Sequence, residues 1–386
     1  MMNAGLYIHI PFCLRKCPYC DFYSVTDLSL QPAFLDALTS EMNMARELDM
    51  GFDTLYIGGG TPSVLAIKTI DNIIKTAHQC FNILSNAEIT LEVNPGKVTE
   101  EQLKGYRQAG VNRINMGVQS FSPTNLDFLE RIHSAGDAQL AIKWAQKAGY
   151  ENIGLDLIYG IPGQTKSSWL KDLQSAIEFH PQHLSCYMLS FEPGTPMHKN
   201  LQNRVFNPLP EHLVCERFET TRSFLNTNGY VQYETSNFAR EVIDESGIKS
   251  ARSNMSRHNM KYWNFSPYIG LGPSAHSFIE PQRFWNHSNV KKYVRELSIG
   301  RLPRAGKESL NRDQLMIEAV YLGLRQTKGI VVDAFDKKFG VNFKAMFTGV
   351  ITNLEKKGLV KMSQNRCALT SKGMLYLDSI AGMFIT

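Results

Sequence analysis

The sequence predicts an α/β protein whose larger part is a partial (β/α)6 barrel, similar to an incomplete TIM barrel, followed by a smaller C-terminal α+β domain of the winged-helix type. Two observations support this prediction. Between Leu6 and Ser190, six short β-rich runs alternate with helical patterns, which is typical of a parallel sheet covered by helices. Beyond residue 310, three helical patterns precede two short β-rich runs, the order expected of a winged helix.

The barrel prediction places six strands at 6–12, 54–59, 87–95, 113–120, 152–160 and 183–190. The helical patterns between them space apolar residues three and four positions apart, as at Ile70, Ile73, Ile74 and Ala77. Right-handed crossovers would wind these units into an open or partial barrel, and ligands gather at the carboxyl ends of such strands. We therefore expect the functional side chains at that edge.

The chain divides into three expected regions: a core over 1–195, an extension over 196–300 and a basic C-terminal domain over 301–386. In the extension the strand-helix alternation fades, leaving a helix near 211–225 and a strand from 230. The last region has helical patterns at 313–325, 331–338 and 343–356, then β-rich runs at 359–362 and 367–370 that would form the wing.

Composition indicates a globular protein, since 43% of the 386 residues are hydrophobic and 20% are charged. No stretch reaches the roughly 18 apolar residues of a membrane span, and the N-terminus lacks a basic segment followed by an apolar one. We therefore expect a cytoplasmic protein. Three of its seven cysteines lie within eight positions, which in a reducing compartment favours a metal site over disulfides.

The net charge of +5 comes from the C-terminal region. Residues 301–386 contain 14 Lys and Arg against 7 Asp and Glu, whereas the remainder contains 27 against 29. An ordinary solvated face explains this excess most simply; a docking surface for an acidic partner or for membrane headgroups is the alternative. The second interpretation would place the protein at the membrane periphery.

Cys13, Cys17 and Cys20 form a C-x3-C-x2-C motif after the first predicted strand. Pro11 and Pro18 favour an extended loop. Three thiolates would bind three irons of a [4Fe–4S] cluster and leave the fourth iron open for a small molecule. A Cys3His zinc site that includes His9 is less favoured, because zinc ligands usually occur as two separated pairs. Three cysteines that merely pack together are less favoured still.

Polar groups also lie late in, or just after, four other predicted strands, at 58–62, 92–95, 119–120 and 156–163. Each has a structural explanation when taken alone: the glycines could form a tight turn, Glu92 could pair with Arg131, and Asp156 could cap a helix. Their joint position at successive strand ends favours a binding function. The Gly58–Pro62 segment matches neither a Walker loop nor a dinucleotide-binding motif.

With Tyr19 before its last cysteine, the cysteine motif resembles that of the radical S-adenosylmethionine (SAM) superfamily. The resemblance implies a [4Fe–4S] cluster whose open iron is chelated by the amino and carboxylate groups of SAM. Electron transfer in that superfamily cleaves the sulfonium to a 5′-deoxyadenosyl radical. The cofactor, rather than the protein, would therefore carry the difficult chemical step.

Four further segments, YIHIPFC, GGGTP, GVQSF and DLIYGIPGQT, are similar to the oxygen-independent coproporphyrinogen III oxidase subgroup. By position, this resemblance implies that Tyr7 packs at the SAM sulfonium and that backbone groups of Gly59, Gly60 and Thr61 contact its methionine part. It implies that Glu92, Gln119, Arg131 and Asp156 serve its carboxylate, ribose and neighbouring groups, and it places Tyr19 in the same site.

The sequence departs from the oxidases at two points. Phe22 stands where they have an additional cysteine, and only twelve residues precede Cys13. The segment His258-Asn259-Met260-Lys261-Tyr262-Trp263 is similar to the H-N-x-x-Y-W motif of the HemW-type haem chaperones in the same subgroup. That resemblance implies haem binding by His258, Asn259, Tyr262 and Trp263, with delivery of haem to apo-haemoproteins, often respiratory ones.

The chemistry of these residues suits haem, because an imidazole can bind iron and aromatic rings can pack on a porphyrin. On a helix, His258 and Tyr262 would share one side. A buried histidine in an aromatic cluster is the structural alternative, and His276 and His287 are alternative iron ligands. A flavodoxin-type electron donor and a homodimer are further expectations.

The sequence thus predicts a haem chaperone that binds a [4Fe–4S] cluster, SAM and haem, without coproporphyrinogen oxidase activity. An oxygen-independent oxidase, or a radical SAM enzyme with another substrate such as RNA, is the alternative. Nucleic-acid binding by the basic C-terminal region is a weaker alternative. A lid or docking domain is the favoured interpretation of that region, and we expect no nucleic acid partner.

Replacing Cys13, Cys17 or Cys20 with serine should abolish cluster binding, because each thiolate would hold one iron. Phe22→Ala, in the same loop, should retain the cluster. Iron and sulfide analysis after anaerobic reconstitution measures both. Full iron content in the serine variants would exclude this assignment.

Overall fold

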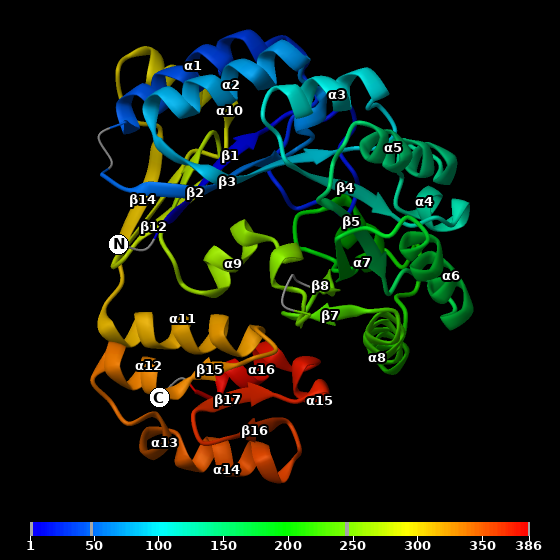
Figure 1. Ribbon diagram of the computed structural model, residues 1–386, viewed down its shortest axis with the longest axis vertical. Coiled ribbons are helices and arrows are strands. Elements are labelled where there is room, and N and C mark those ends of the chain that lie inside the picture. The colour runs from blue at the N-terminus through cyan, green and yellow to red at the C-terminus, as the bar shows by residue number, and fades with distance from the viewer. Residues whose placement is uncertain (1–2, 47–48, 244–246, 385–386) are drawn as a thin grey trace.

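The computed structural model describes residues 3–46, 49–243 and 247–384. A strongly curved sheet with helices around its outer face forms the larger part of the molecule, and a small helical domain with its own short sheet lies below it (Figure 1). The α/β fold class and the winged-helix-like C-terminal domain predicted from the sequence are both confirmed.

Six adjacent parallel strands form the barrel, in the order in which they occur along the chain. They are β1 (Ala4–Ile10), β2 (Gly51–Gly59), β3 (Asn82–Val93), β4 (Arg113–Gln119), β5 (Ile153–Tyr159) and β6 (His183–Met188). Each overlaps a predicted strand. The starts of β2 and β3 precede the predicted ones, because backbone pairing continues past the apolar part of the sequence.

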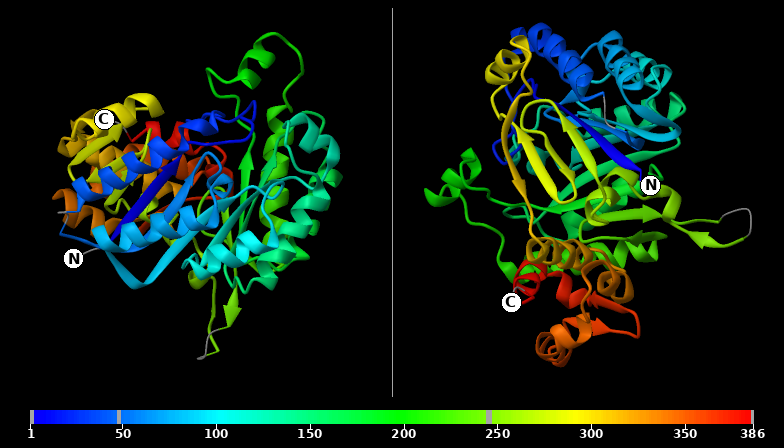
Figure 2. Two further views of the ribbon diagram at one scale, coloured as in Figure 1. Left: turned by 90° about the horizontal axis from the view of Figure 1, so that it is seen from above. Right: turned by 90° about the vertical axis from the view of Figure 1, so that its left-hand side faces the viewer.

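Helices cover the outer face of these strands (Figures 1 and 2). The main ones are α1 (Gln31–Ala45), α2 (Ile67–Cys80), α3 (Glu100–Gln108), α5 (Ala135–Lys147), α6 (Lys166–Ile177) and α8 (Glu211–Thr227). Leu6, Ile8 and Ile10 of β1 are fully buried in this layer, as is Ile70 of α2. Because side chains alternate along a strand, the polar residues between them face the barrel interior.

The sheet continues beyond both edges of the barrel to twelve strands. At one edge β11 (Tyr268–Leu271) pairs in parallel with β1, and β12 (His276–Ile279), β13 (Gln282–Asn286) and β14 (Arg304–Ser309) follow antiparallel. At the other edge lie β8 (Asn237–Arg240) and β7 (Tyr230–Gln232). The sequence did not predict β11–β14, since these strands are short and lack regular polar-apolar alternation. The single strand expected from 230 is instead two strands.

The remaining helices and strands outside the C-terminal domain are short. They are α4 (Pro123–Phe128), α7 (Pro196–Gln202), α9 (Arg257–Trp263), α10 (Val290–Ser298), β9 (Val242–Ile243) and β10 (Lys249–Ser250). Among them α9 has a special position, because it lies on the inner side of the barrel, opposite α1 and α2 (Figure 1).

The C-terminal domain has the predicted helices and wing strands in the predicted order, except that the helix expected over 343–356 is two helices and that β15, α15 and α16 were not predicted. Its elements are α11 (Arg312–Arg325), β15 (Ile330–Val331), α12 (Val332–Phe339), α13 (Phe343–Met346), α14 (Thr348–Lys356), β16 (Val360–Met362), β17 (Arg366–Leu369), α15 (Ser371–Met374) and α16 (Leu377–Gly382). Aromatic rings fill its core, with Phe343 in contact with Phe335, Phe347 and Phe384.

The end of α11 attaches this domain to the barrel. Arg325 forms an ion pair with Glu234 at 2.7 Å, and its guanidinium lies 4.3 Å from the ring centre of Trp263. Gln326 donates a hydrogen bond to the Trp263 carbonyl at 2.8 Å. The segment after α9 is therefore part of the contact between the two domains.

Glu41 of α1 connects the barrel to the added strands. Its buried carboxylate accepts hydrogen bonds from the Gly272 amide at 2.8 Å, the Asn286 side chain at 2.6 Å and the Tyr293 hydroxyl at 2.6 Å. These donors come from the turn after β11, from β13 and from α10. One side chain thus holds three elements that lie far apart in sequence.

Glu41→Ala should lower the free energy of unfolding by about 3–5 kcal/mol, because it leaves buried donors without an acceptor. Urea unfolding followed by circular dichroism measures this. Glu101→Ala, at an exposed position of α3, is the control and should change stability by less than about 0.5 kcal/mol. Equal effects of the two substitutions would contradict the role of Glu41.

Candidate functional site

The cysteine loop is fixed to the carboxyl end of β1 by its backbone. The Cys13 amide donates to the Val25 carbonyl at 3.0 Å, and the Val25 amide donates to the Pro11 carbonyl at 2.7 Å. Cys17 and Cys20 form a turn, with a hydrogen bond of 3.1 Å between their backbones. None of the three thiols is in a disulfide, and Cys17 and Cys20 are half-buried. The loop therefore presents free thiols at the predicted edge of the barrel.

Arg131 brings a positive charge to this loop. Its guanidinium donates to the Cys17 sulfur at 3.2 Å, to the Tyr19 hydroxyl at 3.4 Å and to the Gly117 carbonyl at 2.9 Å. Burial raises the pKa of the Cys20 thiol, and the backbone hydrogen bond at Phe22 and the Lys16 ammonium partly offset this by favouring the thiolate. The ion pair between Glu92 and Arg131 that the sequence suggested does not form. Arg131 instead contacts Cys17 and Tyr19 of the cysteine loop.

The three glycines of GGGTP are required by close packing. A Cβ atom at Gly59 would lie 2.6 Å from the His9 ring, and Gly59 has a φ of +110°. A Cβ at Gly60 would lie 2.7 Å from the Phe12 carbonyl oxygen, which belongs to the cysteine loop. The glycines therefore allow β2 to approach the loop that carries the cysteines.

Backbone donors in this segment are already used within the protein. The Gly59 amide donates to Glu92 at 3.1 Å, the Gly60 amide to the Ile10 carbonyl at 2.8 Å, and the Thr61 amide to the Phe12 carbonyl at 2.7 Å. The Thr61 hydroxyl lies 3.5 Å from the Cys13 sulfur. Any backbone contact of Gly59 or Gly60 with a ligand would therefore use their carbonyl oxygens.

Polar side chains from successive strands line the barrel interior next to the loop. The Tyr56 hydroxyl donates to Glu92 at 2.7 Å, and the Tyr7 and Tyr56 ring centres are 6.1 Å apart. Burial, together with the Asp156 carboxylate, raises the pKa of Glu92 to about 7. The strand register places Gly58 of β2 beside Glu92 of β3 and Asn115 of β4. These residues form one layer across the barrel.

Asp156 and Arg113 continue this polar interior. Asn115 donates to the Asp156 carboxylate at 2.7 Å, and burial raises the pKa of Asp156 to about 6. Ser185 is a second hydrogen-bond partner of Asp156, whereas Nε and Nη1 of Arg113 are buried without a hydrogen-bond partner among the described residues. Buried groups of both charges, one of them with unused hydrogen-bonding capacity, fit a polar, zwitterionic ligand such as SAM.

Gln119 and His9 complete the residues considered from the sequence at this edge. Gln119 ends β4 in the left-handed conformation, with a φ of 66°, and is half-buried. His9 is hydrogen-bonded through both ring nitrogens, to the Tyr7 hydroxyl at 2.9 Å and to the Tyr23 carbonyl at 2.8 Å. This disfavours the Cys3His zinc site. Over 3–46, 49–243 and 247–384, no three Cys, His, Asp or Glu side chains are gathered about a single ion position.

Sequence reasoning missed Tyr56 and Asn115, which lie within strands, and Arg113, which begins β4. The alternation of polar and apolar residues along β4 could have revealed two of them. Arg113, Asn115 and Gly117 occupy every second position of this strand, and the residues between them are apolar. The prediction considered only where the strands end.

The H-N-x-x-Y-W motif lies in α9, so that His258 and Tyr262 share one side of a helix, and α9 closes the opposite end of the barrel from the cysteine loop. The Glu88 carboxylate of β3 accepts from the Arg257 and His258 amides, each at 3.2 Å. The buried imidazole of His258 is hydrogen-bonded to the Thr54 hydroxyl at 2.8 Å and to the Tyr262 hydroxyl at 3.0 Å. Both of its ring nitrogens are therefore engaged within the protein.

The other motif residues face different surroundings. The Asn259 amide belongs to the N-terminal cap of α9, where it donates to the Ser256 hydroxyl at 3.3 Å. Trp263 lies at the contact with the C-terminal domain, and Tyr262 lines a cavity on the outer side of α9. The alternatives lie elsewhere: exposed His276 stacks on Trp285, and His287 is half-buried after β13. Haem contact by these residues stays a prediction.

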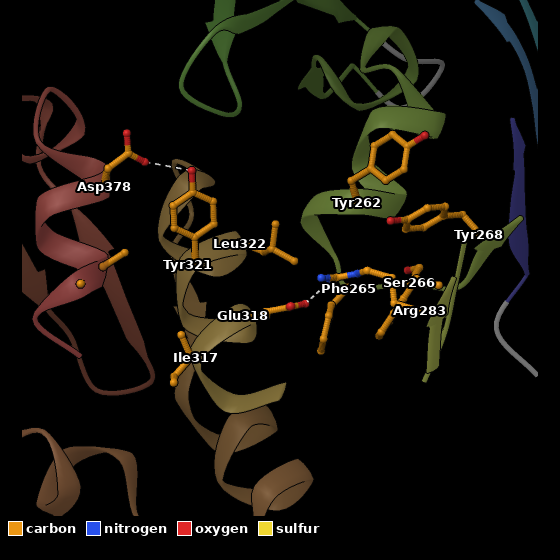
Figure 3. Close-up of a pocket in the computed structure, with 13 residues that line it drawn as sticks. Tyr262, Phe265, Ser266, Tyr268, Arg283, Ile317, Glu318, Tyr321, Leu322 and Asp378 are labelled. Atoms are coloured by element: carbon orange, nitrogen blue, oxygen red, sulfur yellow. Dashed lines mark hydrogen bonds and ion pairs between the residues drawn. The ribbon is translucent and has the colours of Figure 1, made fainter. Parts of the chain in front are cut away.

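The cavity beside Tyr262 has a volume of about 450 Å³ and lies between the barrel part and the C-terminal domain (Figure 3). Aromatic rings form one wall, and α11 and α16 form the other. Its main lining residues are Tyr262, Phe265, Tyr268, Phe278, Arg283, Glu318, Tyr321 and Leu322. Its size is in the range of cavities that hold small-molecule ligands and cofactors.

The described part of the chain contains no helix long and apolar enough to cross a membrane.

Two family models match the chain. Residues 7–176 match the radical SAM superfamily, and residues 310–376 match the HemN C-terminal domain. The second match coincides with the winged-helix-like domain below the barrel.

Several curated proteins are similar over nearly the whole chain. The haem chaperone HemW of Bacillus subtilis is 32% identical over 384 residues, which cover 98% of this chain and 98% of that protein. HemW of Escherichia coli is 38% identical over 283 residues, which cover 70% and 69% of the two chains. Among solved structures, the coproporphyrinogen III oxidase HemN of Escherichia coli matches with a TM-score of 0.85 and 24% identity, covering 100% of this chain and 90% of HemN.

Gly60→Ala should displace the cysteine loop, because its Cβ would meet backbone atoms that cannot move independently. We expect a loss of about 2 kcal/mol of stability, with lower iron content after reconstitution. Gly349→Ala is the control, since Gly349 is exposed in α14 with open space around its Cβ position. It should keep full iron content and be equally or slightly more stable. Unchanged iron binding in Gly60→Ala would show that the loop does not depend on this approach.

Proposed function

The chain belongs to the HemW group of the radical SAM superfamily, and from this premise we propose that it is a haem chaperone that binds a [4Fe–4S] cluster, SAM and haem and delivers haem to apo-haemoproteins. The observation that carries the proposal is its relatedness to HemW haem chaperones from several bacteria over almost the full length of both chains. The fold likeness to HemN, at 24% identity, supports only the architecture.

Cys13, Cys17 and Cys20 would hold the cluster, and the family supports this because radical SAM proteins bind a [4Fe–4S] cluster and SAM. Their free thiols share one loop whose backbone is fixed to β1, and Arg131 would offset the negative charge of the bound thiolates. When bound, the cluster would supply one-electron reduction to a ligand on its open iron. The chain's own part is to hold the loop and to enclose the ligand.

SAM would lie between this loop and the polar layer inside the barrel. Glu92 and Asp156 would accept from its ammonium and ribose hydroxyls, and the carbonyl oxygens of Gly59 and Gly60 are further acceptors. Tyr7 and Tyr19 would pack against its sulfonium and adenosyl parts, while Gln119 and Arg131 lie at the rim. Support comes from Nε and Nη1 of Arg113, which are buried without a hydrogen-bond partner among the described residues and leave hydrogen-bonding capacity for such a ligand.

The loop that follows the motif argues against coproporphyrinogen oxidation. Phe22, at the position of the additional oxidase cysteine, is 68% exposed and packs into no core. A cysteine there would be freely accessible in an oxidase, whereas a phenyl ring provides no thiol chemistry. Oxidase activity is the alternative function that the experiment below has to exclude.

The test is anaerobic reconstitution with iron and sulfide, titration with haem, and transfer of the bound haem to an apo-haemoprotein. We expect uptake of haem in simple stoichiometry, transfer seen as the Soret spectrum of the acceptor, and no conversion of coproporphyrinogen in the presence of SAM and reductant. The reason is that the proposed cluster and SAM sites would be present, whereas Phe22 stands in place of the additional oxidase cysteine.

Coproporphyrinogen is assayed in the same tubes, with 5′-deoxyadenosine as the second product. Turnover of porphyrinogen together with SAM cleavage, without haem uptake, would make the protein an oxidase and overturn the proposal. The Cys17→Ser variant controls for transfer that depends on the cluster.

A further inference from the structure

The cavity beside α9 provides a binding site that the motif residues alone do not define. We propose that haem is held in this cavity between the barrel and the C-terminal domain, with the Tyr268 hydroxyl as the iron ligand and His258 as a positioning residue. This inference rests on the proposed function, because it locates the cargo that the chaperone would carry.

His258 is poorly placed to bind iron in this structure. Its imidazole is 1% exposed and lies inside the barrel, where Thr54 and Tyr262 engage both ring nitrogens. Its ring is also packed against Tyr56, with centres 5.1 Å apart, and it leaves only 3.1 Å for a Cβ atom at Gly5. A porphyrin cannot reach either nitrogen without removing α9 from the barrel.

The cavity on the other side of α9 has the shape and chemistry for a porphyrin. Phe265 and Phe278 are stacked in its wall with centres 4.7 Å apart, and Ile317 and Leu322 line the opposite side from α11. Flat aromatic rings and aliphatic side chains suit a planar apolar macrocycle. In Figure 3, Leu322 projects from α11 toward Tyr262, across the space that a ligand would fill.

Tyr268 offers an oxygen ligand in this cavity. Its ring extends from β11 with the hydroxyl toward the cavity (Figure 3), and no residue of the described chain is hydrogen-bonded to that hydroxyl. By contrast, the Tyr321 hydroxyl donates to Asp378 at 2.9 Å and the Tyr262 hydroxyl is bonded to His258. No His, Cys or Met lines the described part of this cavity, and a tyrosine oxygen is a known haem ligand.

Charges around Tyr268 suit a ferric haem. Burial and the Glu318 carboxylate raise the pKa of Tyr268, and the Arg283 guanidinium opposes them by favouring the phenolate that would bind iron. Glu318 holds Arg283 in place through an ion pair of 2.5 Å.

The motif tyrosine connects His258 to this proposed ligand. His258 is hydrogen-bonded to Tyr262, and the Tyr262 ring packs edge to face on the Tyr268 ring, with centres 4.7 Å apart. A change at His258 would therefore disturb Tyr268 through Tyr262, without His258 touching the haem. The effect of the motif on haem binding would be indirect.

A second cavity competes for this role and is used as the control. It has a volume of about 810 Å³ on the other side of Phe265 and Ser266, and it is lined by Arg257, Lys261, Lys328, Lys338 and Arg366. Its many cations would suit propionates, but polar groups make up a much larger part of its lining than in the first cavity, which suits the macrocycle less well. Ala334 lines only this second cavity, and Leu322 lines only the first.

The first experiment is haem titration of the full-length protein by absorbance, comparing the wild type with Leu322→Trp and Ala334→Trp. An indole at 322 should fill the proposed cavity and weaken haem binding at least about tenfold, whereas Ala334→Trp should stay within about twofold of wild type. Circular dichroism and iron content show whether each variant is folded. Loss of binding in Ala334→Trp but not in Leu322→Trp would place haem in the cationic cavity and overturn the proposal.

The second experiment identifies the iron ligand by resonance Raman and absorbance spectra of the ferric haem complex. Tyr268→Phe should remove the phenolate-to-iron charge-transfer signal, and Tyr321→Phe, the same change in the same cavity, should keep it. His258→Ala should weaken binding but retain the signal. A signal lost in His258→Ala and kept in Tyr268→Phe would overturn the ligand assignment.

The two proposals fail in different ways. A wild-type protein that takes up no haem would contradict the chaperone function itself, and the cavity assignment with it. A wild type that binds and transfers haem, with Leu322→Trp and Tyr268→Phe unaffected, would leave the function standing and refute only this site.

Discussion

The hydrogen bonds that anchor α9 inside the barrel determine how the rest of the molecule is arranged. Six parallel strands present polar residues to their interior, and the ends of such a barrel have to be closed without leaving buried polar groups unpaired. At the amino ends of the strands, Glu88 accepts from the start of α9 and His258 bonds to Thr54. Because α9 is held there, the segment after it is placed against β1 as β11, and Trp263 is placed against the C-terminal domain.

Much of this architecture could be predicted from the sequence, because local patterns determine it. Long apolar runs that alternate with helical spacing predicted all six barrel strands, and proline-bounded cysteines predicted a loop after the first of them. The edges of the sheet could not be predicted in this way. Strands β11–β14 are stabilised by pairing with β1 and by Glu41, which is more than 200 residues away in sequence, so their own composition has little strand signal.

The candidate site shows the same division. The cysteines, the glycines and the acidic residues at strand ends were identified because they stand out against apolar surroundings. Arg113, Asn115 and Tyr56 were missed, since a polar residue inside a strand normally marks a solvated face; here the face is the barrel interior. The glycines were identified as candidates for contact with SAM, but the structure gives them another role as well. The close approach of the cysteine loop requires them, and the amides of Gly59 and Gly60 are already hydrogen-bonded within the protein.

The positions of the two sites have a consequence for how they could influence each other. The cysteine loop follows β1 and α9 contacts its beginning, so the two are separated by up to roughly 25 Å, the length of eight extended residues between Gly5 and Cys13. The space between them is crossed by side chains in contact: Glu92 with Tyr56, Tyr56 with His258, and His258 with Tyr262. A ligand on Glu92 and a ligand beside Tyr262 would therefore meet opposite ends of one connected set of buried groups. His258 is the member of this set that contacts both Tyr56 and Tyr262, and both of its ring nitrogens are bonded to the protein.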